Sequence, residues 1–144
     1  MLDIFITTIY DQKGYRIVII IMLNMGVKNT ARILIADDDE LLREVLKTML
    51  SDFEVIEADS GKRAVVLYKM HRPDVVLMDI VMPEMDGIEA TREITKIDPD
   101  AVVIAITAYA PTKGKDMLDA GAREVLSKPI RRVELVEKIK RYLS

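Results

Sequence analysis

Cysteine is absent from this sequence of 144 residues, and histidine occurs only once. Without cysteine the chain forms no disulfide and offers no thiolate to a metal, and one histidine leaves no ordinary set of zinc ligands. Disulfide-stapled and zinc-binding classes of protein are therefore excluded. A cysteine-free protein of this kind is expected in the cytoplasm.

Long apolar runs and a surplus of basic residues are also missing. The apolar run Ile17 to Leu23 falls short of the roughly 20 residues that cross a bilayer, so a membrane protein is not expected. The formal net charge is -3, and lysine and arginine are dispersed among aspartate and glutamate. This distribution argues against a nucleic-acid-binding surface. The length suits one domain of ordinary size.

Residues 1–24 differ from the rest of the chain because they are rich in isoleucine and tyrosine. Three interpretations stay open. In the first, the segment lies outside the functional domain, which would then start at Met25. In the second, it forms a β-hairpin, with Gln12-Lys13-Gly14 as the turn between residues 4–10 and 15–23. In the third, it anchors the protein at a membrane surface. We treat it as an N-terminal extension whose role is open, ahead of a domain over residues 25–144.

From Ala31 onward, short apolar runs alternate with segments of helical periodicity. Apolar strands can be buried on both sides only if helices flank them, so the alternation predicts an α/β fold, a five-stranded parallel sheet with helices on both faces. Glycine and proline agree with this pattern: helices are expected to open at Gly61 and Gly87, to end before Pro73 and Pro99, and to end at Gly121. The predicted strands are Arg32–Ala36, Phe53–Glu57, Val75–Met78, Ala101–Ile106 and Glu124–Leu126.

Polar side chains follow four of these strands. Three aspartates occupy residues 37–39 after the first strand, Asp79 follows the third, Thr107 the fourth and Lys128 the fifth. In open parallel sheets, ligands lie at the carboxyl ends of the strands, which share one edge. We therefore expect these side chains to form one site.

The residue types at this edge suit magnesium-dependent phosphoryl chemistry. Carboxylates of Asp37, Asp38 and Asp79 are the oxygen ligands that Mg²⁺ prefers. Asp79 is also a candidate nucleophile, because phosphoryl transfer to a carboxylate requires mainly positioning and neutralisation of charge. Mg²⁺ and the Lys128 ammonium would supply positive charge, and the Thr107 hydroxyl would hydrogen-bond the transferred group.

Four stretches together are similar to a known family: "ILIADDDELLR", "DVVLMDIVMPEMDGIEATREI", "VVIAITAYA" and "AGAREVLSKPI". They resemble the receiver domain of two-component response regulators, the CheY-like fold. The resemblance covers residues 31–144, about four fifths of the chain. It implies strand order 2-1-3-4-5 and a signalling switch rather than an enzyme.

The resemblance also implies roles for single residues. Asp79 would be the phosphoacceptor, Asp37 and Asp38 the acidic pair for Mg²⁺, and the Val81 backbone carbonyl a further ligand. Lys128 would pair with the phosphate and would precede a cis peptide bond to Pro129. Asp39 falls one place beyond the acidic pair, and we expect it to cap the first helix.

Partners are implied by the same resemblance. The phosphoryl group would come from a histidine kinase or a histidine phosphotransfer protein, and a downstream effector protein would bind the face made by the fourth helix, fifth strand and fifth helix. Because the sequence ends after the fifth helix, we expect a stand-alone receiver. Chemotaxis and a phosphorelay both remain open.

Four residues bear on how such a switch would work. Val125 stands where receivers usually carry an aromatic residue, and Tyr109 is a candidate substitute, or else a cover for the rim of the pocket. Val81 offers no polar group to orient an attacking water, so slow self-hydrolysis of the phosphorylated form is expected. Gly114 lies inside the fourth helix and predicts that this helix is marginally stable.

Two other functions remain as alternatives. A small magnesium-dependent phosphohydrolase would use Asp37 as nucleophile and Asp39 as acid and base. A receiver-like domain that no longer becomes phosphorylated would only bind partners. The first is disfavoured because Glu40-Leu41 stand where such enzymes carry a small residue and threonine, and the second because every site residue is present.

Overall fold

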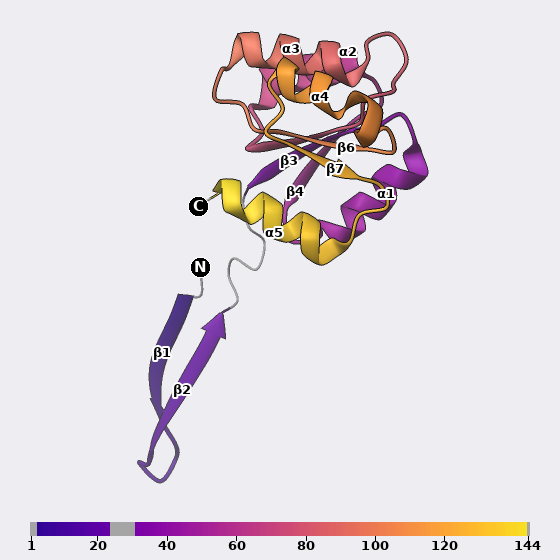
Figure 1. Cartoon of the computed structure of the whole chain (residues 1–144). Helices are drawn as coiled ribbons and strands as arrows, with labels where there is room; N and C mark the ends of the chain where they lie inside the picture. The colour runs from indigo at the N-terminus through magenta and orange to yellow at the C-terminus, as the bar shows by residue number, and fades with distance from the viewer. Residues whose placement is uncertain (1–2, 24–30, 144) are drawn as a thin grey trace. The chain divides into compact units, whose positions relative to one another are not determined.

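The structure is a computed structural model that describes residues 3–23 and 31–143. The chain divides into two compact units, Met1–Thr30 and Ala31–Ser144. The first holds a pair of strands, and the second holds a sheet with helices on both faces (Figure 1).

The N-terminal unit contains a β-hairpin. Strand β1 (Asp3–Tyr10) pairs antiparallel with β2 (Arg16–Leu23) along its whole length. Asp11 holds the turn, because its carboxylate accepts hydrogen bonds from the N–H groups of Lys13 and Tyr15, each 2.8 Å long. The hairpin interpretation, with Gln12-Lys13-Gly14 in the turn, is confirmed. The expected domain start at Met25 lies outside the described residues.

Five parallel strands form the sheet of the second unit. In chain order they are β3 (Arg32–Ala36), β4 (Glu54–Ala58), β5 (Val75–Met78), β6 (Val103–Thr107) and β7 (Glu124–Ser127). Their order in space is β4-β3-β5-β6-β7, and every neighbouring pair is parallel. Counted within this unit, that is the expected order 2-1-3-4-5, so the predicted fold class is confirmed.

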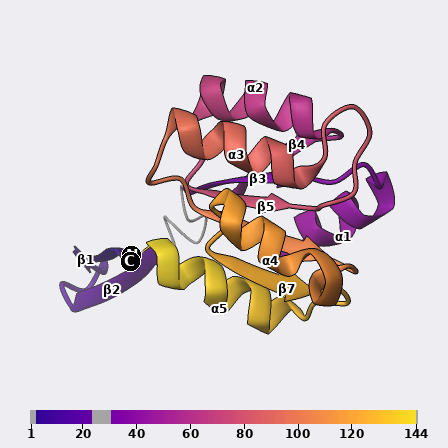
Figure 2. The same ribbon diagram turned by 45° about the horizontal axis from the view of Figure 1, so that its top comes forward.

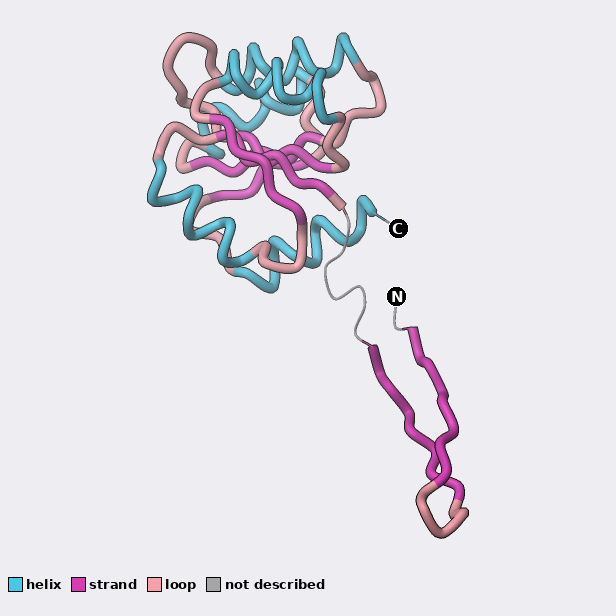
Figure 3. Tube along the Cα trace, turned by 180° about the vertical axis from the view of Figure 1, so that it is seen from behind, coloured by secondary structure: helices cyan, strands magenta, loops and turns pink. Residues whose placement is uncertain are grey.

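Helices cover both faces of the sheet. They are α1 (Glu40–Met49), α2 (Gly61–His71), α3 (Gly87–Ile97), α4 (Ala110–Ala120) and α5 (Arg132–Leu143). The helices α2, α3 and α4 lie side by side on one face (Figure 2), and α1 and α5 cover the other, as the view from behind also shows (Figure 3). Among the described residues, no helix is both long enough and apolar enough to cross a membrane.

Alternate side chains of each strand enter two separate cores. Leu34 and Ala36 of β3 pack with buried residues of α2, α3 and α4. Ile33 and Ile35 of the same strand pack with buried residues of α1 and α5. The central strands β3, β5 and β6 are therefore buried on both sides, whereas the edge strands β4 and β7 are partly exposed.

Several predicted strand boundaries were wrong by one or two residues, including the starts of β4 and β6 and the ends of β4, β6 and β7. The strand expected from Ala101 begins at Val103, because the Ala101 N–H still closes a turn onto the Asp98 carbonyl at 3.0 Å. The strand expected from Phe53 begins at Glu54, since the Phe53 N–H bonds the Leu50 carbonyl at 2.9 Å. Turn hydrogen bonds thus extend into apolar residues that the sequence pattern assigns to strands.

Candidate functional site

Three carboxylates meet at the carboxyl edge of the sheet. Asp37 and Asp38 follow β3, and Asp79 follows the neighbouring strand β5. Ligand oxygens of the three residues all lie within 4.8 Å of one another. The structure therefore brings together the three side chains that the sequence predicts as Mg²⁺ ligands, and their donor set of carboxylate oxygens fits that ion.

Asp37 is the most constrained member of this cluster. The residue is 3% exposed, and its backbone N–H donates to the Ala58 carbonyl at 3.0 Å, extending the pairing of β3 with β4. Its carboxylate oxygen Oδ1 accepts the Asp39 N–H at 2.9 Å. Asp38, by contrast, is exposed.

Lys128 reaches two of the three carboxylates. Its ammonium lies 3.0 Å from Asp37 Oδ2 and 3.4 Å from Asp79 Oδ2. The Lys128 N–H bonds the Thr107 carbonyl at 3.0 Å, which ties the start of its loop to the end of β6. The peptide bond from Lys128 to Pro129 is cis, as the family resemblance implies.

Burial raises the pKa of Asp79 above the usual value for a carboxylic acid, and the negative charge of Asp37 raises this pKa further. The Lys128 ammonium and the Ile80 N–H, which donates to Asp79 Oδ1 at 2.8 Å, act in the opposite direction. Burial and the Asp37 charge together therefore disfavour the ionised form of Asp79. A divalent ion among the carboxylates would offset this effect.

Thr107 lies at the end of β6, where the sequence predicts it, and is fully buried. Its hydroxyl oxygen accepts the Tyr109 N–H at 3.0 Å. The side chain of Tyr109 is on the surface, 49% exposed. The hydroxyl predicted to bind a phosphoryl group is thus hydrogen-bonded to the N-cap residue that precedes α4.

Asp39 caps α1. Its Oδ1 accepts hydrogen bonds from the N–H groups of Leu41 at 3.0 Å and Leu42 at 3.3 Å, as expected from its position. A carboxylate held in this way is poorly placed to act as the acid and base of a hydrolase. The capping geometry weighs against the phosphohydrolase alternative, which requires a free Asp39.

The backbone of the loop after Asp79 passes close to the first residues of α2 and α3, Gly61 and Gly87. A Cβ atom on Gly87 would overlap the Asp79 carbonyl oxygen, and one on Gly61 would overlap the Met85 carbonyl oxygen. The sequence pattern indicates both glycines only as helix openings. Their further role is to let the loop that carries Val81 lie against the site. Val81 itself is exposed, and the metal-binding role of its carbonyl stays a prediction.

Arg43 belongs to the site although no sequence pattern indicates it. It lies on α1, six residues after Asp37, and its guanidinium donates from Nη1 to the Asp37 carbonyl at 2.7 Å. Its Nε donates to Glu57 of β4 at 3.2 Å. An arginine one turn inside a helix carries no sequence signal for such a contact, because the contact depends on how α1 packs beside β3.

In the region predicted to change during switching, two small residues of β7 and α4 lie next to each other. Val125 of β7 is partly buried, and its nearest methyl would lie 3.4 Å from a Cβ added to Gly114 of α4. The aromatic ring usual at the Val125 position is therefore replaced by a smaller side chain that faces a residue without one. The side chain that acts in switching stays a prediction.

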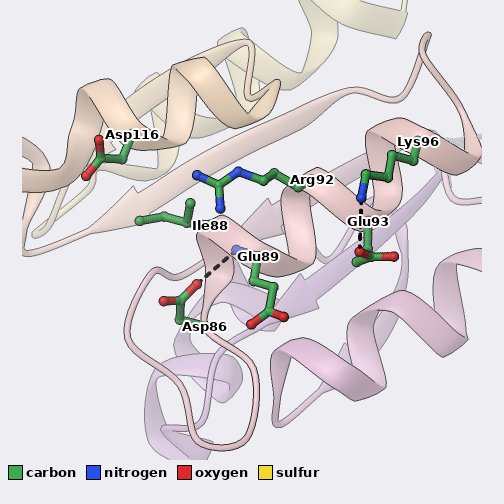
Figure 4. A pocket seen from close by; sticks show the side chains of 7 residues that line it. All are labelled: Asp86, Ile88, Glu89, Arg92, Glu93, Lys96 and Asp116. Atoms are coloured by element: carbon green, nitrogen blue, oxygen red, sulfur yellow. Dashed lines mark hydrogen bonds and ion pairs between the residues drawn. The ribbon is translucent and has the colours of Figure 1, made fainter.

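A groove beside α3 and α4 is separate from the acidic cluster. Its lining mixes both signs of charge, and Asp86 and Glu93 already bind the Glu89 N–H and the Lys96 ammonium, at 2.9 and 3.6 Å (Figure 4). None of the three clustered aspartates lines this groove. The chemistry of the chain is therefore assigned to the carboxyl edge of the sheet.

Comparison with known proteins agrees with this geometry. The family model of the response regulator receiver domain matches residues 33–140. The chemotaxis protein CheY of Bacillus subtilis (strain 168) is 43% identical over 117 residues, which cover 78% of this chain and 98% of that protein.

Two solved structures are similar in fold. One is the receiver domain of sensor histidine kinase PA1611 from Pseudomonas aeruginosa PAO1, which has a magnesium ion coordinated in its active-site cleft. It matches with a TM-score of 0.75 and 32% identity, and the match covers 79% of this chain and 98% of that one. A chain of the CheX-CheY-BeF3-Mg²⁺ complex from Borrelia burgdorferi matches with a TM-score of 0.74 and 32% identity, covering 79% and 90%. With this strand order and this acidic edge, the chain belongs to the response regulator receiver domain family of two-component signalling.

Proposed function

We propose that this protein accepts a phosphoryl group on Asp79, in a reaction that depends on Mg²⁺, and that phosphorylation switches its binding to another protein. The observation that carries the proposal is the position of the Asp79 carboxylate, which lies within 4.8 Å of two further carboxylates and 3.4 Å from the Lys128 ammonium. A receiver domain of the CheY type requires such a site.

The chain's own residues have distinct parts in this reaction. An oxygen of the Asp79 carboxylate attacks phosphorus, the new O–P bond forms as the P–N bond to the donor histidine breaks, and the released imidazole keeps the electron pair of that bond and takes up a proton. The Lys128 ammonium and the Thr107 hydroxyl stabilise the negative charge on the transferred oxygens.

Asp37, Asp38 and the Val81 carbonyl would hold Mg²⁺ together with Asp79. When bound, the ion supplies positive charge that neutralises both the clustered acids and the incoming phosphoryl group. Burial and the Asp37 charge raise the pKa of Asp79 in the structure, so a cation would favour the ionised form that acts as nucleophile.

The proposed partners are those of the family. A histidine kinase or a histidine phosphotransfer protein is the donor, and the face formed by α4, β7 and α5 binds the effector. A CheY relative in complex with CheX illustrates the class of protein partner that such a domain binds. The proposed location is the cytoplasm, where proteins rarely contain disulfides and a sequence without cysteine is ordinary.

The test is intact-mass analysis after incubation with acetyl phosphate, with and without Mg²⁺. The wild type should gain the mass of one phosphoryl group only with Mg²⁺, and Asp79→Asn should gain none. Asp59→Asn is the matched control, because Asp59 is an exposed aspartate directly after β4 and lies outside the cluster. It should be labelled like the wild type.

Three outcomes would contradict the proposal. The first is equal labelling of the wild type and Asp79→Asn. The second is repeated turnover of an aryl phosphate that is lost in Asp37→Asn and kept in Asp79→Asn, which would favour the phosphohydrolase. The third is a wild type that takes up no phosphoryl group with Mg²⁺ present, which would indicate a domain that only binds partners.

A further inference from the structure

Arg43 connects three elements next to the acidic cluster. It belongs to α1, donates to the Asp37 carbonyl at the end of β3 at 2.7 Å, and donates to Glu57 of β4 at 3.2 Å. Its side chain is 14% exposed, and Lys47 holds the other oxygen of Glu57 at 3.1 Å. The guanidinium is therefore fixed from two sides in a partly buried position.

The carbonyl that Arg43 binds belongs to the peptide unit between Asp37 and Asp38. A peptide unit is planar, so the direction of its carbonyl fixes the direction of the N–H and Cα of the next residue. Fixing the Asp37 carbonyl thereby fixes where the Asp38 side chain starts.

The two aspartates depend on this contact to different degrees. The Asp37 carboxylate has anchors of its own, since Lys128 lies 3.0 Å from Oδ2 and the Asp39 N–H lies 2.9 Å from Oδ1. Asp38 is exposed, and within residues 3–23 and 31–143 no hydrogen bond or ion pair holds its side chain. Its backbone is held on both sides, by the peptide unit that Arg43 binds and by the Asp39 N–H that donates to Asp37 Oδ1, and of these two contacts only the one from Arg43 comes from outside residues 37–39.

We infer that Arg43 is a positioning residue for the metal site, which acts by orienting the Asp37–Asp38 peptide so that Asp38 contributes to Mg²⁺ binding. Glu57 supports it by holding the second side of the guanidinium. This inference rests on the proposed function, because it assumes that the aspartate cluster binds Mg²⁺. It concerns a residue outside the predicted ligand set.

The charge of Arg43 makes the inference easy to separate from a simple electrostatic effect. Removing a cation beside three carboxylates makes the cluster more negative, and by Coulomb's law alone this would tighten Mg²⁺ binding. Loss of the positioning contact would weaken it, and partners that orient metal ligands are typically worth about tenfold or more in affinity. The two effects have opposite signs.

The experiment is a Mg²⁺ titration of the full chain followed by the amide signals of residues 36–39 in ¹H–¹⁵N spectra. Arg43→Met keeps the apolar stem and removes the donors, and it should weaken Mg²⁺ binding by about tenfold. Arg32→Met is the matched control, because Arg32 pairs with Glu54 at 3.1 Å on the same two strands, at the far end from the site. It should bind Mg²⁺ like the wild type.

A double variant identifies the route of the effect. If Arg43 acts through Asp38, adding Arg43→Met to Asp38→Asn should cause no further loss of Mg²⁺ affinity. Once the Asp38 carboxylate has been removed, its orientation by Arg43 no longer affects binding. A purely structural effect of Arg43 would instead multiply the two losses. Multiplied losses, unchanged affinity in Arg43→Met or tighter binding would each overturn the inference.

Glu57→Gln keeps the test decisive if Arg43→Met does not fold. This milder change should weaken Mg²⁺ binding by about threefold, again with no added loss in the Asp38→Asn background. Unchanged affinity in Glu57→Gln would overturn the inference. A wild type whose amide signals do not respond to Mg²⁺ would contradict the proposed function itself, whereas a responding wild type with an equally responding Arg43→Met contradicts the positioning role alone.

Discussion

Replacing Gly114 by alanine should stabilise the protein. Gly114 lies inside α4, where alanine is favoured over glycine by about 1 kcal/mol. The added methyl would be buried, with its nearest neighbour, Val125 Cγ1, at 3.4 Å and two further Val125 carbons at 3.8 Å, which is ordinary contact distance. Burial of one such group adds up to about 0.8 kcal/mol. The expected gain is about 1–2 kcal/mol, or about 4–8 °C in Tm for a domain of this size.

Urea unfolding followed by circular dichroism measures this gain, with Gly87→Ala and Gly121→Ala as controls. Both controls should lose stability, because a Cβ on Gly87 overlaps the Asp79 carbonyl and Gly121 has φ +117. A loss of stability in Gly114→Ala at unchanged m-value would refute the reasoning, since it would mean that the space beside Val125 is already filled.

Amide exchange extends the same prediction to dynamics. The start of α4 has no side-chain cap, whereas Asp39, Ser60 and Asp86 cap the other three helices for which a cap is described. Exchange in α4 should therefore be faster than in those helices, and Gly114→Ala should slow it selectively. Equal exchange across the helices before substitution would show that α4 is not marginal.

Three further predictions concern single residues. Glu84 has φ 67, a left-handed conformation that is unfavourable for residues with a Cβ. Glu84→Val should therefore lower the free energy of unfolding, measured in urea, by about 1–2 kcal/mol. Glu84→Gly should leave it unchanged or raise it by up to about 1 kcal/mol. The Lys138 ammonium, 2.7 Å from Glu124, lowers the pKa of Glu124 below its usual value of 4.5, so the pair stabilises the fold above that pH and the stabilisation disappears as pH falls through the lowered pKa. Glu124→Gln should therefore cost about 1 kcal/mol at pH 7 and progressively less as the pH falls below 4.5, and a cost that does not change with pH would contradict this. Val81→Asn, which offers a polar group to orient water near Asp79, should speed loss of the phosphoryl group about tenfold in a mass-spectrometric time course, and a wild-type phosphoprotein that decays within seconds with Mg²⁺ would contradict the slow hydrolysis expected for Val81.

The layered fold was predictable because the central strands β3, β5 and β6 are almost entirely apolar and the helices are marked at their ends. Ile33 to Ala36 are all apolar and all buried, so this continuous apolar run could be assigned to a strand covered on both faces. The same local logic predicted Asp39 as a helix cap, since a carboxylate before a helical segment bonds the first free N–H groups. The gathering of the three aspartates was predictable from topology, because adjacent parallel strands end at one edge.

Contacts that depend on tertiary packing were not predictable. The bond from Arg43 to the Asp37 carbonyl requires the position of α1 against β3, and residue type alone does not show which carbonyl a guanidinium binds. The positive φ of Glu84 is likewise imposed by the loop around it, since glutamate has no preference for that conformation. Strand starts were shifted for a related reason, as turn hydrogen bonds extend past the point where hydrophobicity begins.

The unequal distances from Lys128 have a consequence for how the charges would rearrange on metal binding. The ammonium lies closer to Asp37, at 3.0 Å, than to Asp79, at 3.4 Å, so it pairs mainly with the carboxylate next to the proposed nucleophile. A divalent ion held by Asp37, Asp38 and Asp79 would offset the same negative charge. The lysine would then be less strongly held by Asp37 and more available to pair with a phosphoryl group on Asp79.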